Sequence, residues 1–110
     1  MLNEKDYCDY DTCVALEELG YPRYCYDNGG ELDKILSMVT LYEAQKWLRE
    51  EKNISVFPER NSFGWYCGLH WFENSVERNS YPFDEVSSYE EALLEGIKEA
   101  IKILKEESNG

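Results

Sequence analysis

The sequence predicts an α+β domain in which an antiparallel sheet of about four strands packs against three helices, mainly on one face, in the order αββαββα. Two segments with apolar residues at helical spacing each begin with a capping-box pattern. An aromatic-rich stretch from 63 to 72 is typical of a strand. The length of 110 residues suits one hydrophobic core, so residues 1–110 are expected to form a single domain with a frayed tail at 106–110.

The first helix is expected to begin after Asp9 and to end at Gly20. An Asp side chain can accept a hydrogen bond from a first-turn amide, and Gly can adopt the left-handed conformation that ends a helix. The following segment, 23–36, is predicted to form a hairpin, because Asp27-Asn28-Gly29-Gly30 tolerates the positive φ angles of a tight turn.

The other two helices carry clearer signals. Thr40 and Glu43 form a capping-box pattern, and the helix that they begin is expected to stop at Asn53. Ser88 and Glu91 repeat the pattern before the last helix, which is predicted to begin at 87 or 88. Its apolar stripe consists of Leu93, Ile97, Ala100, Ile101 and Leu104.

The segments between these helices are predicted to be strands. One runs over 54–57 and ends at Pro58, a turn follows at 59–62, and the next strand covers 63–72. In that strand the odd-numbered residues from 65 to 71 form an apolar face assigned to the core. The opposite face presents Tyr66, Gly68, His70 and Phe72, and either the first hairpin covers it or it is a contact surface. Residues 81–86 could add an edge strand.

Net charge is the most distinctive feature of the composition, at −12. The first 33 residues hold nine acidic and two basic side chains. This excess disfavours binding to nucleic acid or to anionic membranes, because both depend on Lys and Arg contacts to phosphate. It allows a basic protein partner, with Asp6, Asp9, Asp11, Glu17 and Glu18 as the candidate surface. The simpler interpretation is that the acids keep the chain in solution.

The polar start of the chain lacks the pattern of a signal peptide, and no apolar run is long enough to span a bilayer. We therefore expect a cytoplasmic location. In a reducing cytosol the cysteines are expected to be free thiols rather than disulfides.

Catalysis and metal binding find little support. Cys67 and His70 have the C-x-x-H spacing of zinc ligands, but residues three apart in a strand point to opposite faces. Cys8 and Cys13 lack a tight C-x-x-C arrangement. We therefore predict no catalytic residue, no metal and no cofactor. A Cys/His enzyme remains a minor alternative, which requires Cys25, Cys67 and His70 to converge.

Three stretches carry a resemblance: residues 40–52, Gly64-Trp65-Tyr66, and residues 88–97. Together they resemble small uncharacterised proteins encoded by gut Bacteroidales and by their phages or prophages. The likeness covers residues 40–105, and more loosely 5–20, whereas the first hairpin departs most. The group has no activity to carry over, so the resemblance implies a biological setting and no site.

These observations predict a non-enzymatic accessory protein that binds a macromolecule, with another protein or a second copy of the chain as partner. The alternative is a binder of small molecules or single-stranded nucleic acid that uses Tyr66, His70 and Phe72 as an aromatic platform.

Overall fold

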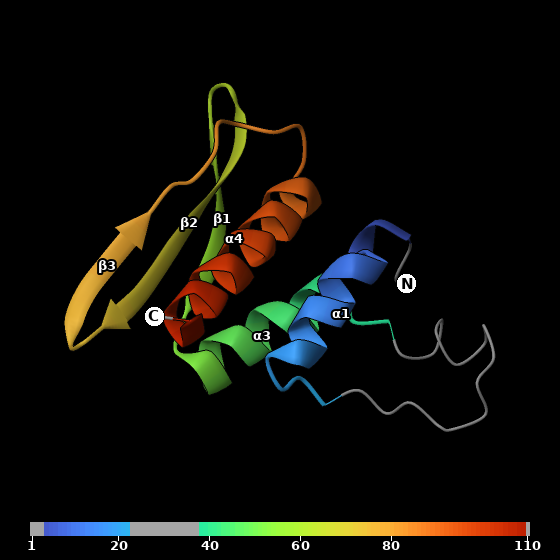
Figure 1. Ribbon diagram of the computed structural model, residues 1–110. Helices are drawn as coiled ribbons and strands as arrows, with labels where there is room; N and C mark the ends of the chain where they lie inside the picture. Colours follow the sequence, from blue (N-terminus) through green and yellow to red (C-terminus); the bar gives the residue numbers. More distant parts are fainter. Residues whose placement is uncertain (1–3, 23–37, 110) are drawn as a thin grey trace, which may run out of the picture.

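The computed structural model describes residues 4–22 and 38–109, in which three α-helices accompany one antiparallel sheet of three strands. The α+β class is therefore confirmed, with three strands in place of the predicted four or so. Figure 1 shows helix α4 lying across the sheet, with α3 and α1 beyond it. The predicted hairpin at 23–36 falls outside the described residues.

The first two α-helices begin directly after the predicted N-cap residues, Asp9 and Thr40. A short 3₁₀ helix, η1 (Glu4–Asp6), precedes α1 (Tyr10–Glu18), and Asp9 caps α1 by accepting a hydrogen bond from the Thr12 amide at 2.8 Å. Gly20 has a φ of 106° and provides the left-handed exit. Helix α3 (Leu41–Lys52) has both hydrogen bonds of the Thr40–Glu43 capping box. It ends at Asn53 in the left-handed conformation, as predicted.

The sheet has the order β1-β2-β3, formed by β1 (Ser55–Asn61), β2 (Gly64–Glu73) and β3 (Val76–Ser80). The prediction that the first strand ends at Pro58 was wrong, because β1 continues to Asn61. Proline is tolerated here because β1 lies at the edge of the sheet that the described residues form.

The third strand also differs from the prediction. Residues 76–80 form it, whereas the predicted edge strand at 81–86 is reduced to an isolated bridge between Val86 and Trp65. Asn74 and Ser75 both have positive φ and connect Glu73 to its partner Val76. Two positive φ angles in a two-residue loop are the geometry of a type I′ hairpin turn. This turn places β3 directly after β2.

Helix α4 (Tyr89–Asn109) covers one face of the sheet, which we call the inner face. Ser88 caps the helix, since its hydroxyl accepts a hydrogen bond from the Glu91 amide at 3.1 Å. Cys67 and Leu69 on the inner face are fully buried, as the odd-numbered alternation of β2 predicts. The core continues through Leu93 and Ile97 of α4 to Leu48 of α3.

Gly96 allows α4 to approach the sheet closely. A β-carbon at this position would overlap the Cys67 sulfur and lie 2.7 Å from Val56 Cγ1. Gly96 is itself buried in the middle of a long helix, where glycine is otherwise unfavourable by about 1 kcal/mol. Close packing against the inner face therefore explains why glycine occupies this position.

Replacing Gly96 with Ala should destabilise the protein by about 1–2 kcal/mol, because overpacking outweighs the gain in helix propensity. Urea unfolding followed by circular dichroism measures the change. Lys102→Ala on the exposed side of α4 is the control and should stay within about 0.5 kcal/mol of wild type. In a Cys67→Ala background the cost of Gly96→Ala should fall, and an equal cost in both backgrounds would contradict the packing explanation.

Candidate functional site

The candidate site is the face of the sheet that α4 does not cover, which we call the outer face. The register of the strands determines which residues share this face: Tyr66 lies opposite Glu59, His70 opposite Asn79, and Phe72 opposite Glu77. Residues paired in this way point to the same side of a sheet. The even-numbered alternation of β2 therefore brings Tyr66, His70 and Phe72 together on one face, as predicted.

Aromatic rings cluster on the outer face. The Phe57 ring lies over Gly68, where any β-carbon would overlap it. The Tyr81 ring, just after β3, contacts Phe57 edge-on at a centroid distance of 6.5 Å and Tyr66 at 5.9 Å. His70 and Phe72 form a second edge-on pair at 5.2 Å. Phe72 and Tyr81 remain 57% and 60% exposed, so the cluster offers apolar area to a partner.

Carboxylates hold two of these side chains in place. Tyr66 Oη donates a hydrogen bond to Glu59 Oε2 at 2.5 Å, which raises the pKa of the tyrosine. His70 Nε2 lies 2.8 Å from Glu77 Oε1. The two Arg side chains of the strands, Arg60 and Arg78, pair opposite Trp65 and Trp71 and so belong to the inner side. The outer face of the strands therefore combines aromatic rings with carboxylates and contains no Lys or Arg.

The five acidic side chains predicted as a candidate contact surface differ in their surroundings. Asp6 is buried and accepts a hydrogen bond from Tyr42 Oη at 2.9 Å. Asp9 caps α1 and pairs with Lys98 Nζ at 3.1 Å. Burial alone would raise the Asp9 pKa, but hydrogen bonds from Thr12 and Lys98 outweigh it and keep the pKa below its usual value. Asp11, Glu17 and Glu18 are exposed on α1, where Glu18 pairs with Lys105 at 3.5 Å.

Cys67 and His70 lie on opposite faces, so the structure does not bring them together. Cys67 is fully buried beneath α4, and this burial raises its pKa to about 12. Cys8 and Cys13 are also buried. The Cys8 pKa is raised mainly by a hydrogen bond with the Cys13 thiol and also by burial. Cys25 lies outside the described residues. In the described ranges 4–22 and 38–109, no three His, Cys, Asp or Glu side chains form a group that could hold a metal.

Several features of the outer face had weak sequence signals. The diagonal contact of His70 with Glu77 depends on the β2–β3 register, which the Asn74-Ser75 turn sets. Tyr81 lies outside every strand and reaches the cluster only through the path of the chain after β3. Asn74-Ser75 followed by a short polar strand could have indicated this hairpin, since Asn favours positive φ.

No protein-family model, curated protein or solved structure matches the chain. Among the described helices, none is both long enough and apolar enough to cross a membrane.

The Tyr42 hydroxyl should ionise at a higher pH than an ordinary tyrosine. Its hydrogen bond to Asp6 raises its pKa to about 12, above the usual 10.0. Because the folded pKa is the higher one, this contribution to stability is complete below pH 10 and is lost as the pH rises toward 12. The difference between wild-type and Tyr42→Phe absorbance titrations at 295 nm should show one tyrosine with a midpoint near 12. A midpoint near 10 would contradict the hydrogen bond.

The buried thiols should resist modification. Cys8, Cys13 and Cys67 are all buried, and the pKa values of Cys8 and Cys67 are raised, so reaction of these thiols with Ellman's reagent at pH 8 should be at least about 100-fold slower than that of glutathione. A Cys25→Ser variant isolates these three cysteines, and urea should restore ordinary rates. Fast native modification of Cys67, identified by mass spectrometry, would revive the Cys/His enzyme hypothesis.

Proposed function

We propose that this chain is a non-enzymatic accessory protein that binds a basic protein partner through the outer face of its sheet. One observation carries the proposal: exposed aromatic rings and carboxylates share that face, and its strands contribute no Lys or Arg. The rings supply apolar contact area, and the carboxylates favour a partner that presents Lys and Arg.

The geometry favours binding because the surface is already ordered. Glu59 fixes the Tyr66 ring, and Tyr81 packs against both Tyr66 and Phe57. Side chains that are held before association lose less conformational entropy on binding. The net charge of −12 adds long-range attraction toward a basic surface.

The same charges disfavour the two alternative ligands of this face, a second copy of the chain and nucleic acid. Two copies of the chain would bring like-charged surfaces together, which disfavours a homodimer. Sheets that stack RNA bases combine aromatic rings with basic side chains, and Glu59 and Glu77 would repel phosphate instead. Nucleic acid is therefore a less suitable ligand than a basic protein.

The resemblance to proteins of gut Bacteroidales and their phages suggests where the partner is found. We place the chain in the bacterial cytoplasm, where a protein from a phage or prophage could modulate host machinery by occupying a basic surface. The acids near the start of the chain contribute to steering rather than to the contact itself, since Asp6 is buried and Asp9 is paired with Lys98.

Substitutions on the outer face should weaken partner capture. Immobilised protein is exposed to a Bacteroidales lysate at low and high salt, and retained proteins are quantified by mass spectrometry. Basic proteins that bind wild type should fall by about 5–30-fold with Phe72→Ala or Tyr66→Ala, as expected for loss of an interface anchor. Glu59→Gln/Glu77→Gln should weaken capture and reduce its dependence on salt.

The charge-matched control is Asp11→Asn/Glu17→Gln on α1, which should leave capture nearly unchanged. Circular dichroism verifies that each variant is folded. Loss with the α1 control but not with the outer-face variants would overturn the proposal and assign binding to the acidic helix. A dimer in analytical ultracentrifugation that Phe72→Ala dissociates would identify a second copy as the occupant.

A further inference from the structure

The aromatic rings of the outer face form two edge-on pairs. His70 and Phe72 meet at an interplanar angle of 80°, and Phe57 and Tyr81 meet at 90°. We call them the His70–Phe72 pair and the Phe57–Tyr81 pair. Tyr66 extends the second pair, because its ring is tilted by 52° against that of Tyr81 at a centroid distance of 5.9 Å. Rings at such steep angles present two faces to one ligand group, and a compact apolar ring can contact both.

The two ring pairs are separated by about one turn of a polyproline II helix. The Phe57 ring lies over Gly68, and the middle of the His70–Phe72 pair is three residues farther along β2. Three strand residues span about 10 Å. The three residues of one polyproline II turn span about 9 Å. A ligand in this conformation therefore presents the same side of its helix to both pairs.

The face of a sheet suits a ligand that requires no backbone hydrogen bonds from it. Backbone N–H and C=O groups of a strand lie in the plane of the sheet, so the outer face offers side chains only. Two of these side chains are already hydrogen-bonded to neighbouring carboxylates, Tyr66 to Glu59 and His70 to Glu77. Proline has no backbone N–H, and the polyproline II backbone stays in contact with water. A proline-rich segment therefore loses fewer hydrogen bonds on this face than another peptide would.

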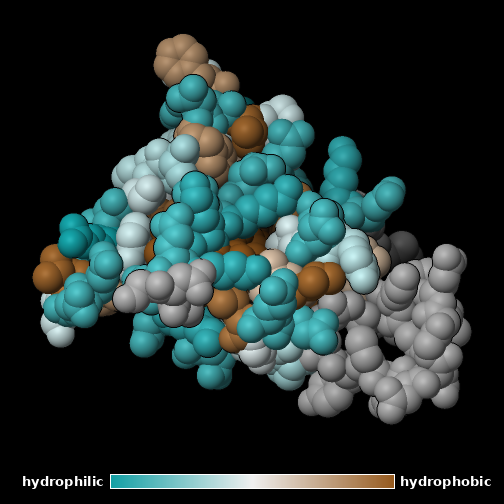
Figure 2. Space-filling model, in the orientation of Figure 1, coloured by the Kyte–Doolittle hydropathy of each residue, from teal (hydrophilic) through white to brown (hydrophobic). Residues whose placement is uncertain are grey.

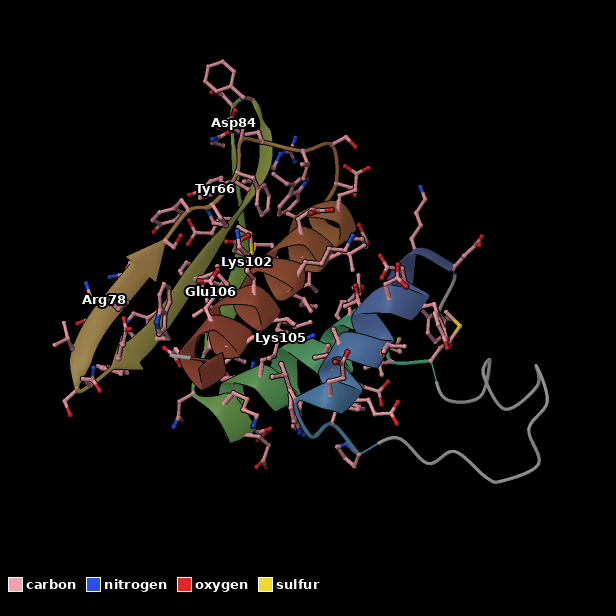
Figure 3. The ribbon with its side chains drawn as sticks, in the orientation of Figure 1. Tyr66, Arg78, Asp84, Lys102, Lys105 and Glu106 are labelled. Carbon is pink, nitrogen blue, oxygen red and sulfur yellow. The ribbon has the colours of Figure 1, made fainter. Side chains whose placement is uncertain are left out.

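Charge specifies what should accompany the prolines. Glu59 lies opposite Tyr66 and Glu77 opposite Phe72, so a carboxylate lies near each ring pair. In Figure 3 the labelled Tyr66 lies beside the chain that leaves β3, whereas the two labelled lysines lie on α4, which packs on the inner face. An arginine or lysine next to the prolines would therefore approach carboxylates, and the strands present no competing cation on this face.

We propose that the outer face binds a proline-rich segment of the basic partner in the polyproline II conformation, with Arg or Lys beside the prolines, an inference that rests on the proposed function. Proline rings would pack on the two ring pairs, and the cations would pair with Glu59 and Glu77. The ligand helix is preformed and the rings are held in place, so both sides lose little conformational entropy.

Titration of the full chain with a peptide of three Pro-Pro-Arg repeats tests this assignment without the partner. The reporters are the ring resonances of Phe72 and Tyr81 in ¹³C-correlated NMR spectra, assigned by their loss in Phe72→Leu and Tyr81→Leu. Saturable shifts are expected at both rings. A peptide of three Ala-Ala-Arg repeats has the same length and charge and should bind at least about fivefold more weakly. A peptide of three Pro-Pro-Glu repeats should produce no saturable shift.

Variants of the outer face should weaken binding of the Pro-Pro-Arg peptide, followed at Phe72. Tyr81→Ala should weaken it by about 5–30-fold, as expected for loss of a contact anchor. Glu59→Gln/Glu77→Gln should weaken it by about fivefold and reduce its dependence on salt. The matched control is Tyr10→Ala on α1, a tyrosine of similar exposure, 56% against 60% for Tyr81, and it should leave the titration unchanged.

Three outcomes would overturn the inference. The first is the absence of saturable shifts with the Pro-Pro-Arg peptide. The second is equal or tighter binding of the Ala-Ala-Arg peptide, which would assign the outer face to a basic helix. The third is an equal loss of affinity in Tyr10→Ala and Tyr81→Ala, which would place the contact elsewhere. If basic proteins from the lysate are still captured through the outer face in any of these cases, the proposed function stands and only the proline-rich ligand is rejected.

Discussion

The close contact between α4 and the inner face of the sheet determines the rest of this structure. Gly96 permits it, because a side chain there would meet Cys67 and Val56. This contact buries the odd-numbered face of β2 and leaves the even-numbered face on the side away from α4. The buried Cys67 thiol and the exposed aromatic rings are thus two results of the same packing, and the sheet separates Cys67 from any partner that reaches the outer face.

Local signals in the sequence were sufficient wherever a hydrogen bond between near neighbours decides the structure. The Thr40–Glu43 capping box, the Asp9 cap and the Asn53 terminus all formed as predicted. Strand alternation also assigned the two faces of β2 correctly, because side-chain direction follows directly from the backbone period. Even so, β1 continues beyond Pro58. Whether a strand lies at the edge of a sheet, where proline is tolerated, depends on distant residues and not on the local sequence.

The contacts that complete the candidate site are nonlocal, and this is why the sequence did not reveal them. Tyr81 joins Phe57 and Tyr66 through the route of the chain after β3. Tyr42 reaches Asp6 across 36 positions and removes that carboxylate from the predicted acidic surface. Figure 2 shows that the side of the molecule facing the viewer is mainly hydrophilic, with smaller hydrophobic patches among the hydrophilic groups. Whether a carboxylate is free to contact a partner therefore depends on its burial and its ion pairs, which the composition does not reveal.

The short strand β3 has a consequence for how the chain behaves when concentrated. Among the described residues β2 is its single strand neighbour, and a strand with one unpaired edge invites chains to polymerise through added strands. Glu77 and Arg78 point to opposite sides of the strand, so an incoming strand would meet a charged side chain on either side. Five residues also offer few backbone hydrogen bonds to such a strand. The charged side chains and the short length of β3 therefore make this edge a poor template for fibril growth.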